Sequence, residues 1–143
     1  MKHAAHFVIS LLSMAYLAGP AQAEIVVVVH PDSPIQSLSA KDIADLYLGR
    51  SRTLGSREHA VVLDHPRDSK LRSDFFSLLN GMDLRRVNAY WARLQFSGDT
   101  QPPVSLPDNQ TIINTVRLNR QAIGYVDASA LTPEVKPVLR LKP

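Results

Sequence analysis

Four basic side chains surround a serine in the segment VVLDHPRDSKLRSDFFSLLNG, residues 61–81. Around Ser69 these side chains are His65, Arg67, Lys70 and Arg72. A serine that opens an amphipathic helix offers its hydroxyl, and the first backbone N–H groups of a helix have no partner within it. These groups carry partial positive charge, so phosphate or sulfate can bind there. The segment therefore predicts either an anion-binding site or an ordinary helix start among solvated charges.

The anion-binding interpretation gives each of these residues a role. Ser69 caps the helix and supplies its hydroxyl, while Lys70 and Leu71 supply backbone N–H groups. The Lys70 side chain itself is expected to face water. The side chains expected to bring positive charge to the anion are Arg67, Arg72 and His65. The predicted site therefore combines main-chain and side-chain donors from six neighbouring positions.

A second candidate contact is Ser97 with Gly98, in the segment FSGDTQPP at 96–103. Both residues are suitable hydrogen-bond donors. The segment also has the composition of a plain turn that ends a helix, and this is the favoured interpretation.

Two other chemistries receive little support. Asp64, His65 and Ser69 have the composition of a hydrolase triad, but adjacent residues on an extended segment point to opposite faces, so Asp64 is poorly placed to orient His65. His59 and His65 with Glu58 fit no standard zinc spacing. We therefore predict no enzyme, no metal site and no cofactor.

The N-terminal residues have the form of a cleavable secretory signal. A short basic start precedes an apolar run over 4–20, and Ala21-Gln22-Ala23 has the small-x-small pattern of a cleavage site. The run is short for a membrane span, and no stop-transfer pattern follows it. We predict a signal peptide at 1–23, one domain at 24–143, and a periplasmic or secreted protein without stable membrane insertion.

Amino-acid composition excludes several classes of function. The chain contains no cysteine, which excludes thiol catalysis, cysteine-type zinc sites and covalent haem attachment. Its formal net charge is +3, which is too small to predict nucleic-acid binding but mildly favours anionic ligands.

Hydrophobic patterns and turn signals predict a layered α/β sheet covered by helices. Helices are expected at 40–48, from Ser69 to about Gly81, at about 83–95, and after a cap at Asp108. The expected strands are 24–30, 59–64, 122–127 and 135–141, the last at a sheet edge because it contains Pro137. The segments 51–58 and 99–109 are expected to be loops.

The order and spacing of these segments resemble the phosphate-type periplasmic substrate-binding proteins of ABC importers. The segments that carry the resemblance are DIADLYLGR (42–50), the strand–turn–helix unit around Ser69, YWARLQFSG (90–98) and AIGYVD (122–127). Members of that family have two lobes that close on the ligand, and this chain resembles one lobe only. The resemblance implies a type 2 periplasmic-binding fold, export to the periplasm, recognition of an oxyanion and no catalysis.

The family's anion loop reads R-x-D-x-S-G-T, and only its serine is kept here, as Ser69. The family arginine falls on His65 and the aspartate on Arg67, whereas the glycine and threonine fall on Lys70 and Leu71. Losing the threonine removes one hydroxyl donor, and a side chain on Lys70 adds bulk where the backbone should approach the ligand. Arg67 adds a positive charge that offsets part of this loss.

Two functions follow from these considerations. The first is an exported binding protein for phosphate or a similar oxyanion, linked to an ABC phosphate transport system or another periplasmic or membrane transport partner. The second is a periplasmic interaction module that keeps the fold but has lost ligand binding. The departures around Ser69 support the second function, and the kept serine supports the first.

Overall fold

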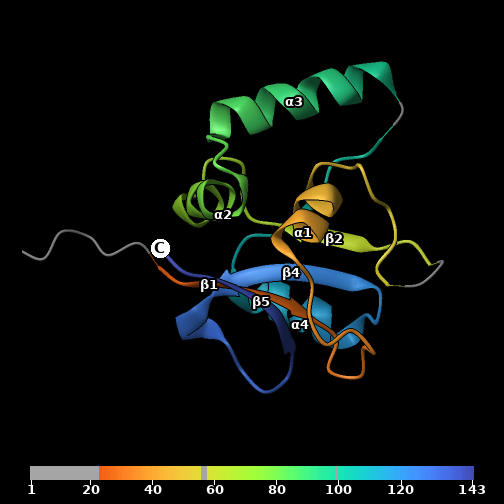
Figure 1. The fold of residues 1–143 in the computed structure, drawn as a ribbon, viewed down its shortest axis with the longest axis vertical. Helices are drawn as coiled ribbons and strands as arrows, with labels where there is room; N and C mark the ends of the chain where they lie inside the picture. The colour runs from red at the N-terminus through yellow and green to blue at the C-terminus, as the bar shows by residue number, and fades with distance from the viewer. Residues whose placement is uncertain (1–22, 56–57, 99) are drawn as a thin grey trace, which may run out of the picture.

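The computed structural model describes residues 23–55, 58–98 and 100–143 (Figure 1). The predicted signal peptide therefore lies outside the described residues, apart from its last position. Along the described chain the order is β1 (Ile25–Val29), α1 (Ala40–Tyr47), β2 (Val61–Asp64), α2 (Lys70–Asn80), α3 (Leu84–Ser97), β3 (Val104–Ser105), α4 (Asn109–Leu118), β4 (Ala122–Asp127), the short 3-10 helix η1 (Ala128–Ala130) and β5 (Lys136–Leu141).

The predicted helix starts are confirmed by their capping hydrogen bonds. Ser39 and Asp42 form a capping box at α1, in which each side chain accepts the other's backbone N–H at 3.0 Å. Asp108 caps α4 by accepting the backbone N–H of Thr111 at 2.8 Å. These side chains replace hydrogen bonds that the first turn of a helix cannot make within itself.

The strands form one mixed sheet in the order β3-β2-β4-β1-β5. β2 is parallel to both β3 and β4, whereas β1 is antiparallel to both of its neighbours, β4 and β5. β5 lies at one edge of the sheet, as Pro137 predicted, since proline has no N–H to donate to a further strand.

β3 was not predicted, because the sequence 99–109 was expected to be loop throughout. Val104 and Ser105 pair with Leu63 and Asp64 at the end of β2. The strand is only two residues long and follows two prolines, so it has no alternation of apolar and polar residues to reveal it.

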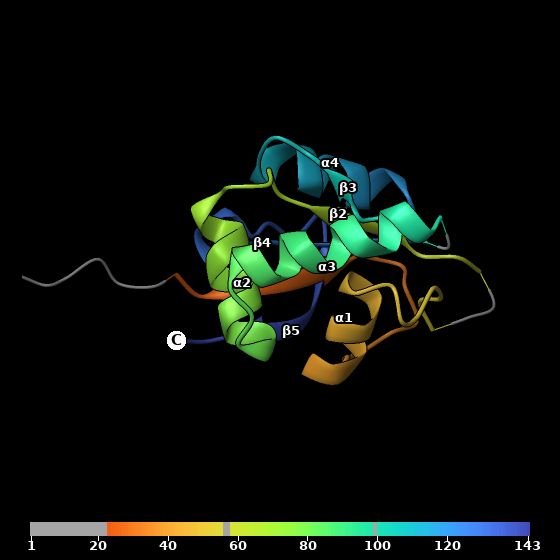
Figure 2. The same ribbon diagram turned by 90° about the horizontal axis from the view of Figure 1, so that it is seen from above.

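Helices cover both faces of the sheet, giving three layers (Figures 1 and 2). Every residue of β1 is buried, since alternate valines face opposite layers. Ile25, Val27 and Val29 join the larger core beneath α1 and α2. Val26 and Val28 join a second core beneath α4. Because β1 is buried on both faces, it appears in the sequence as a continuous apolar run.

α4 approaches the sheet closely at Gly124 in β4. A Cβ atom built on Gly124 would lie 2.7 Å from a methyl carbon of Ile112, which is closer than real contacts allow. Glycine at this position therefore lets the helix pack directly on the strand.

α3 is attached to the end of α1 by two aromatic side chains. Trp91 is buried, and its indole N–H donates to the carbonyl of Tyr47 at 3.2 Å. The hydroxyl of Tyr90 donates to the carbonyl of Leu48 at 2.5 Å. Both carbonyls lie at the C-terminal end of α1, where helical hydrogen bonds run out. This attachment fixes the position of α3 above the β2 side of the sheet.

Alkaline pH is expected to destabilise the domain through two buried tyrosines. Burial, reinforced by the negative charge of Asp64, raises the pKa of Tyr47 and of Tyr125 well above the ordinary value. A group whose pKa is raised by folding contributes stability below its unfolded pKa, here about 10, and that contribution is lost as pH rises further. Chemical denaturation at a series of pH values above 9 should show that the free energy of unfolding falls more steeply as pH rises. In Tyr125→Phe this fall should be smaller. Tyrosinate absorbance from both residues while the fold is intact near pH 10 would contradict this expectation.

Candidate anion-binding site

The residues of the predicted anion site lie where β2 leads into α2. Ser69 is the N-cap of α2, and its Oγ accepts the backbone N–H of Arg72 at 3.0 Å. The backbone N–H groups of Lys70 and Leu71 make no hydrogen bond with any described residue. Two unpaired donors therefore remain beside the Ser69 hydroxyl, at the positive end of the helix dipole.

The side chain of Lys70 does not take part in this arrangement. Its Nζ forms an ion pair with Asp74 one turn along the helix at 2.6 Å, and 72% of the side chain is exposed. This agrees with the expectation that the lysine side chain faces water and leaves the backbone N–H as its contribution to the site.

Arg72 forms a buried ion pair with Asp64, the last residue of β2. The Arg72 Nε donates to Asp64 Oδ2 at 2.9 Å, and the side chains are 8% and 6% exposed. The other carboxylate oxygen accepts the backbone N–H of His65 at 2.8 Å and the hydroxyl of Tyr125 at 2.5 Å. Three donors therefore satisfy the buried carboxylate of Asp64, which stays away from the N–H groups of Lys70 and Leu71.

The rest of the Arg72 guanidinium is held by α3 and by the turn before α2. Its Nη1 donates to the carbonyl of Arg67 at 2.9 Å and to the side-chain oxygen of Asn88 at 2.8 Å. The Nη2 group makes no hydrogen bond with the described residues, so it keeps donors for a ligand. Arg72 is thus fixed in place, and Asp64 offsets most of its charge.

His65 is buried and faces β4. Its Nε2 lies 2.8 Å from the carbonyl of Tyr125, and because a carbonyl only accepts, Nε2 carries the hydrogen. Only Nδ1 is left for other contacts. The same geometry separates His65 from Asp64, whose carboxylate binds the backbone of His65 and not its ring. Asp64, His65 and Ser69 therefore do not form a catalytic triad.

A cavity of about 190 Å³ lies between α3 and the carboxyl ends of β2 and β3. The polar residues that line it are Asp64, His65, Arg67, Arg72, Asn88, Gln95 and Ser105. The Ser105 hydroxyl donates to the carbonyl of His65 at 3.3 Å. Arg67 is exposed, whereas His65 and Arg72, the other two side chains expected to bring charge to the anion, are buried. Ser69 and the following N–H groups do not line this cavity, so the predicted donors divide between the helix start and the cavity.

Ser97 and Gly98 lie at the other end of α3. The Ser97 hydroxyl donates to the carbonyl of Leu94 at 2.7 Å, and Gly98 ends the helix with a left-handed conformation at φ +77°. These are the interactions of an ordinary helix end. The structure does not bring this pair together with Ser69.

Sequence reasoning missed three contributors to the cavity: Asn88, Gln95 and Ser105. Asp64 was considered only as part of a triad, although its position at the carboxyl end of a buried strand is a signal for a binding site in α/β folds. Asn88 and Gln95 lie on α3 without a recognisable motif. Ser105 belongs to β3, the strand that was not predicted.

No protein-family model matches the chain, and no curated protein matches it. Solved structures match its fold. A protein from Clostridium perfringens, assigned to phosphate ABC transport as a substrate-binding protein and solved with bound phosphate, gives a TM-score of 0.65 at 20% identity. That match covers 82% of this chain and 46% of the other. An ABC-type phosphate transport receptor from Vibrio cholerae gives a TM-score of 0.63 at 17% identity, and the match covers 82% of this chain and 47% of the receptor.

The described chain therefore has the fold of one lobe of a phosphate-binding protein of ABC transport. PstS from Borrelia burgdorferi shares this fold at a TM-score of 0.62 and 12% identity, over 81% of this chain and 47% of its own. The chain spans about half the length of these structural relatives. Within the described residues, no helix combines the length and apolar character needed to span a membrane.

Proposed function

We propose that this chain is one lobe of an exported binding protein for phosphate or a similar oxyanion. The observation that carries the proposal is the pair of unpaired N–H groups of Lys70 and Leu71 beside the hydroxyl of Ser69. The same helix start serves as an anion site in many proteins, because main-chain donors and the helix dipole act together. The fold shared with phosphate-binding proteins supports this choice of ligand.

Two acidic residues precede the helix start, Asp64 and Asp68. The carboxylate of Asp64 is engaged by Arg72, Tyr125 and the His65 backbone, so it does not occupy the donors that the anion would use. Asp68, directly before Ser69, is exposed, so solvent screens its negative charge. Arg67 is exposed at the mouth of the cavity and is free to turn toward an anion, adding a charge-assisted hydrogen bond.

A single lobe offers only one wall of the site, since its structural relatives are about twice as long. Water reaches the anion on the open side, which weakens each hydrogen bond. We therefore expect weak binding by the isolated chain. A periplasmic or membrane transport partner that covers the open side would raise the affinity.

Replacing Lys70 by proline tests the main-chain donor directly. Lys70 is the first residue of α2, where proline is tolerated because the N–H has no partner in the helix. Lys70→Pro is therefore expected to fold and to lose much of the stabilisation that phosphate gives. For an intact site that stabilisation is about 2.7 kcal/mol when phosphate is present at 100 times its dissociation constant. Thermal unfolding with and without phosphate measures the difference.

Lys70→Ala is the matched control, because it removes the same side chain and ion pair but keeps the N–H. This variant should still be stabilised by phosphate. Ser69→Ala and Arg67→Ala should reduce that stabilisation. Ser77→Ala and Arg93→Ala, at exposed positions elsewhere, should leave it unchanged. Each variant is compared with its own unliganded state, since losing the Ser69 cap alone costs about 1 kcal/mol. Equal phosphate effects in Lys70→Pro and Lys70→Ala would remove the support for a main-chain anion site.

The second candidate function is an interaction module without a ligand. The observation that favours it is the engagement of Arg72, whose guanidinium is held by Asp64, Asn88 and the Arg67 carbonyl. This arrangement stabilises the fold without an anion. Absence of any thermal effect with phosphate, sulfate or other anions, together with a partner that co-purifies with the full chain, would favour the module.

A further inference from the structure

The cavity of about 190 Å³ between α3 and the carboxyl ends of β2 and β3 is lined by two buried polar side chains with unused hydrogen-bonding atoms. They are Arg72, which is 6% exposed, and His65, which is 4% exposed. The Nη2 of Arg72 and the Nδ1 of His65 have no hydrogen-bond partner among the described residues. Within the described part of the chain, every fully enclosed nitrogen or oxygen of a side chain does have a partner. These two atoms therefore reach open space, and the open space that both residues border is this cavity.

The polar lining combines hydrogen-bond donors with acceptors. The Nη2 of Arg72 carries two N–H groups, and Asn88 offers its amide nitrogen because its oxygen already accepts from Arg72. At pH 8 an ordinary histidine is neutral, and the Nδ1 of His65 is then an acceptor because Nε2 carries the ring hydrogen. The Ser105 oxygen is a second acceptor, since its hydrogen is donated to the His65 carbonyl. The lining therefore favours a ligand that both accepts and donates hydrogen bonds.

The charges on the buried walls of this cavity cancel. The carboxylate of Asp64 pairs with the Arg72 guanidinium at 2.9 Å, and both side chains are buried. Arg67 adds a positive charge only at the mouth, where the side chain is exposed and solvent screens it. An anion inside the cavity would face the His65 and Ser105 acceptors without a hydrogen to give them, and unpaired buried polar groups are costly. The interior therefore favours a neutral ligand.

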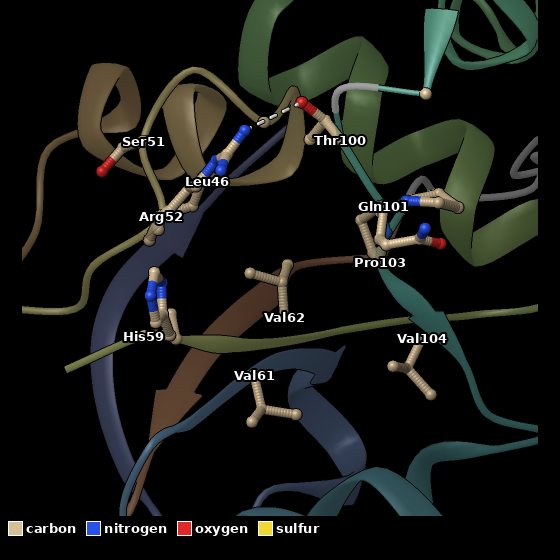
Figure 3. A pocket seen from close by; sticks show the side chains of 14 residues that line it. Leu46, Ser51, Arg52, His59, Val61, Val62, Thr100, Gln101, Pro103 and Val104 are labelled. Carbon is tan, nitrogen blue, oxygen red and sulfur yellow. Dashed lines mark hydrogen bonds between the residues drawn. The ribbon is translucent and has the colours of Figure 1, made fainter. Parts of the chain in front are cut away.

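The remaining walls of the cavity are mainly apolar. Trp91 and Ala92 contribute them from α3, and Pro102 and Pro103 contribute them from the segment before β3. The two prolines also line a larger cavity, and Figure 3 shows Pro103 from within it. Proline has a fixed φ and no N–H, so these residues form a stiff wall without a backbone donor. A short hydrocarbon tail can displace water from such a surface.

We propose that this cavity binds a small neutral carboxamide. The carbonyl oxygen of the ligand has two lone pairs, which accept from Arg72 Nη2 and from the Asn88 amide. Its NH2 group has two hydrogens, which it donates to His65 Nδ1 and to the Ser105 oxygen. Its hydrocarbon tail lies along the apolar walls. This inference goes beyond the proposed oxyanion function, because it uses neither the Ser69 hydroxyl nor the N–H groups that follow it, and its ligand carries no charge.

Titration of the full chain with butyramide at pH 8, in the absence of phosphate, tests the proposal. Trp91 is the single tryptophan of the sequence and lines the cavity, so its indole N–H signal in nuclear magnetic resonance spectra reports on binding there. This signal should shift saturably, with a dissociation constant in the millimolar range. Butyrate and 2-pentanone keep the shape but lack the N–H donors, so each should bind about tenfold more weakly. From acetamide to butyramide the affinity should rise about fourfold for each methylene group.

Two pairs of variants assign the binding to this cavity. Asn88→Asp keeps the oxygen that accepts from Arg72 but removes the amide donors, so it should weaken butyramide binding about tenfold. Asn114→Asp, the same change at an exposed position on α4, should leave binding unchanged. Ala92→Phe should fill the cavity and prevent binding without altering a polar group. Ala89→Phe, an exposed position one turn earlier on α3 and outside the cavity, should leave binding unchanged.

The proposal is overturned if butyrate or 2-pentanone binds as tightly as butyramide, or if Asn88→Asp or Ala92→Phe leaves the affinity unchanged. Failure of butyramide to shift the Trp91 signal saturably would also overturn it. Phosphate is absent from all of these measurements, so failure here is distinct from failure of the oxyanion site.

Discussion

Arg72→Ala is expected to lower the free energy of unfolding by about 3–5 kcal/mol, because it leaves the buried carboxylate of Asp64 without its charged partner. The substitution also removes the hydrogen bonds from Arg72 to Asn88 and to the Arg67 carbonyl, which connect α2 to α3 and to the preceding turn. The guanidinium lies 5.3 Å from the centre of the Phe76 ring, so packing is lost as well. Urea denaturation followed by circular dichroism measures the change.

Lys70→Ala provides the matched control for this prediction. It removes a cation two residues away on the same helix, and that cation is also paired with an aspartate. Because the lysine is 72% exposed and the pair joins neighbouring turns of one helix, its loss should cost no more than about 0.5 kcal/mol. The double variant Asp64→Asn with Arg72→Met should be more stable than Arg72→Ala, since no charge is then left buried. Similar losses for Arg72→Ala and Lys70→Ala would contradict the structural role assigned to the buried pair.

Phe75→Ala is expected to cost about 3–5 kcal/mol, the range for removing a buried phenyl ring. Phe75 is fully buried, and its ring stacks on Tyr125 with centroids 3.7 Å apart and planes 4° apart. It also meets Tyr47 edge to face at 4.8 Å. The ring therefore joins α1, α2 and β4 in one aromatic cluster, beside the Tyr125 hydroxyl that holds Asp64.

Phe96→Ala is the control, because it makes the same chemical change at a side chain that is 96% exposed on α3. Its effect should be within about 0.5 kcal/mol of zero. The two variants are compared by the same urea denaturation. A large loss of stability in Phe96→Ala would show that Phe96 packs against surface that the structure leaves open. A small loss of stability in Phe75→Ala would show that the aromatic cluster is not the centre of the core.

Local signals predicted most of the fold. The predicted helix starts carry capping side chains, and α2 and α3 end at Gly81 and Gly98, both with positive φ. β1 and β4 are continuous apolar runs bounded by turns, so their extent could be predicted closely. β3 could not be predicted, because its two residues are strand only through their pairing with β2. The antiparallel place of β1 in the sheet likewise depends on partners distant in sequence.

The candidate site was less predictable, since its side chains are positioned by distant segments. Ser69 was identified as a cap because the cap and its helix are adjacent in sequence. Nothing local to Arg72 indicated that its partners would be Asp64 and Asn88. His65 likewise lies sixty residues from the carbonyl of Tyr125 that it binds. The roles of Arg67, His65 and Arg72 toward an anion stay predictions that the phosphate experiments address.

The two outer strands of the sheet have a consequence for the behaviour of the protein at high concentration. An open sheet edge invites a strand from another molecule, which is a common first step of aggregation. β3 presents only two residues along its outer side, and Pro137 interrupts the donors of β5. Neither border offers a long, regular row of hydrogen-bonding groups to a neighbour. The sheet can therefore keep its apolar strands in the interior while its borders discourage strand exchange and fibre growth.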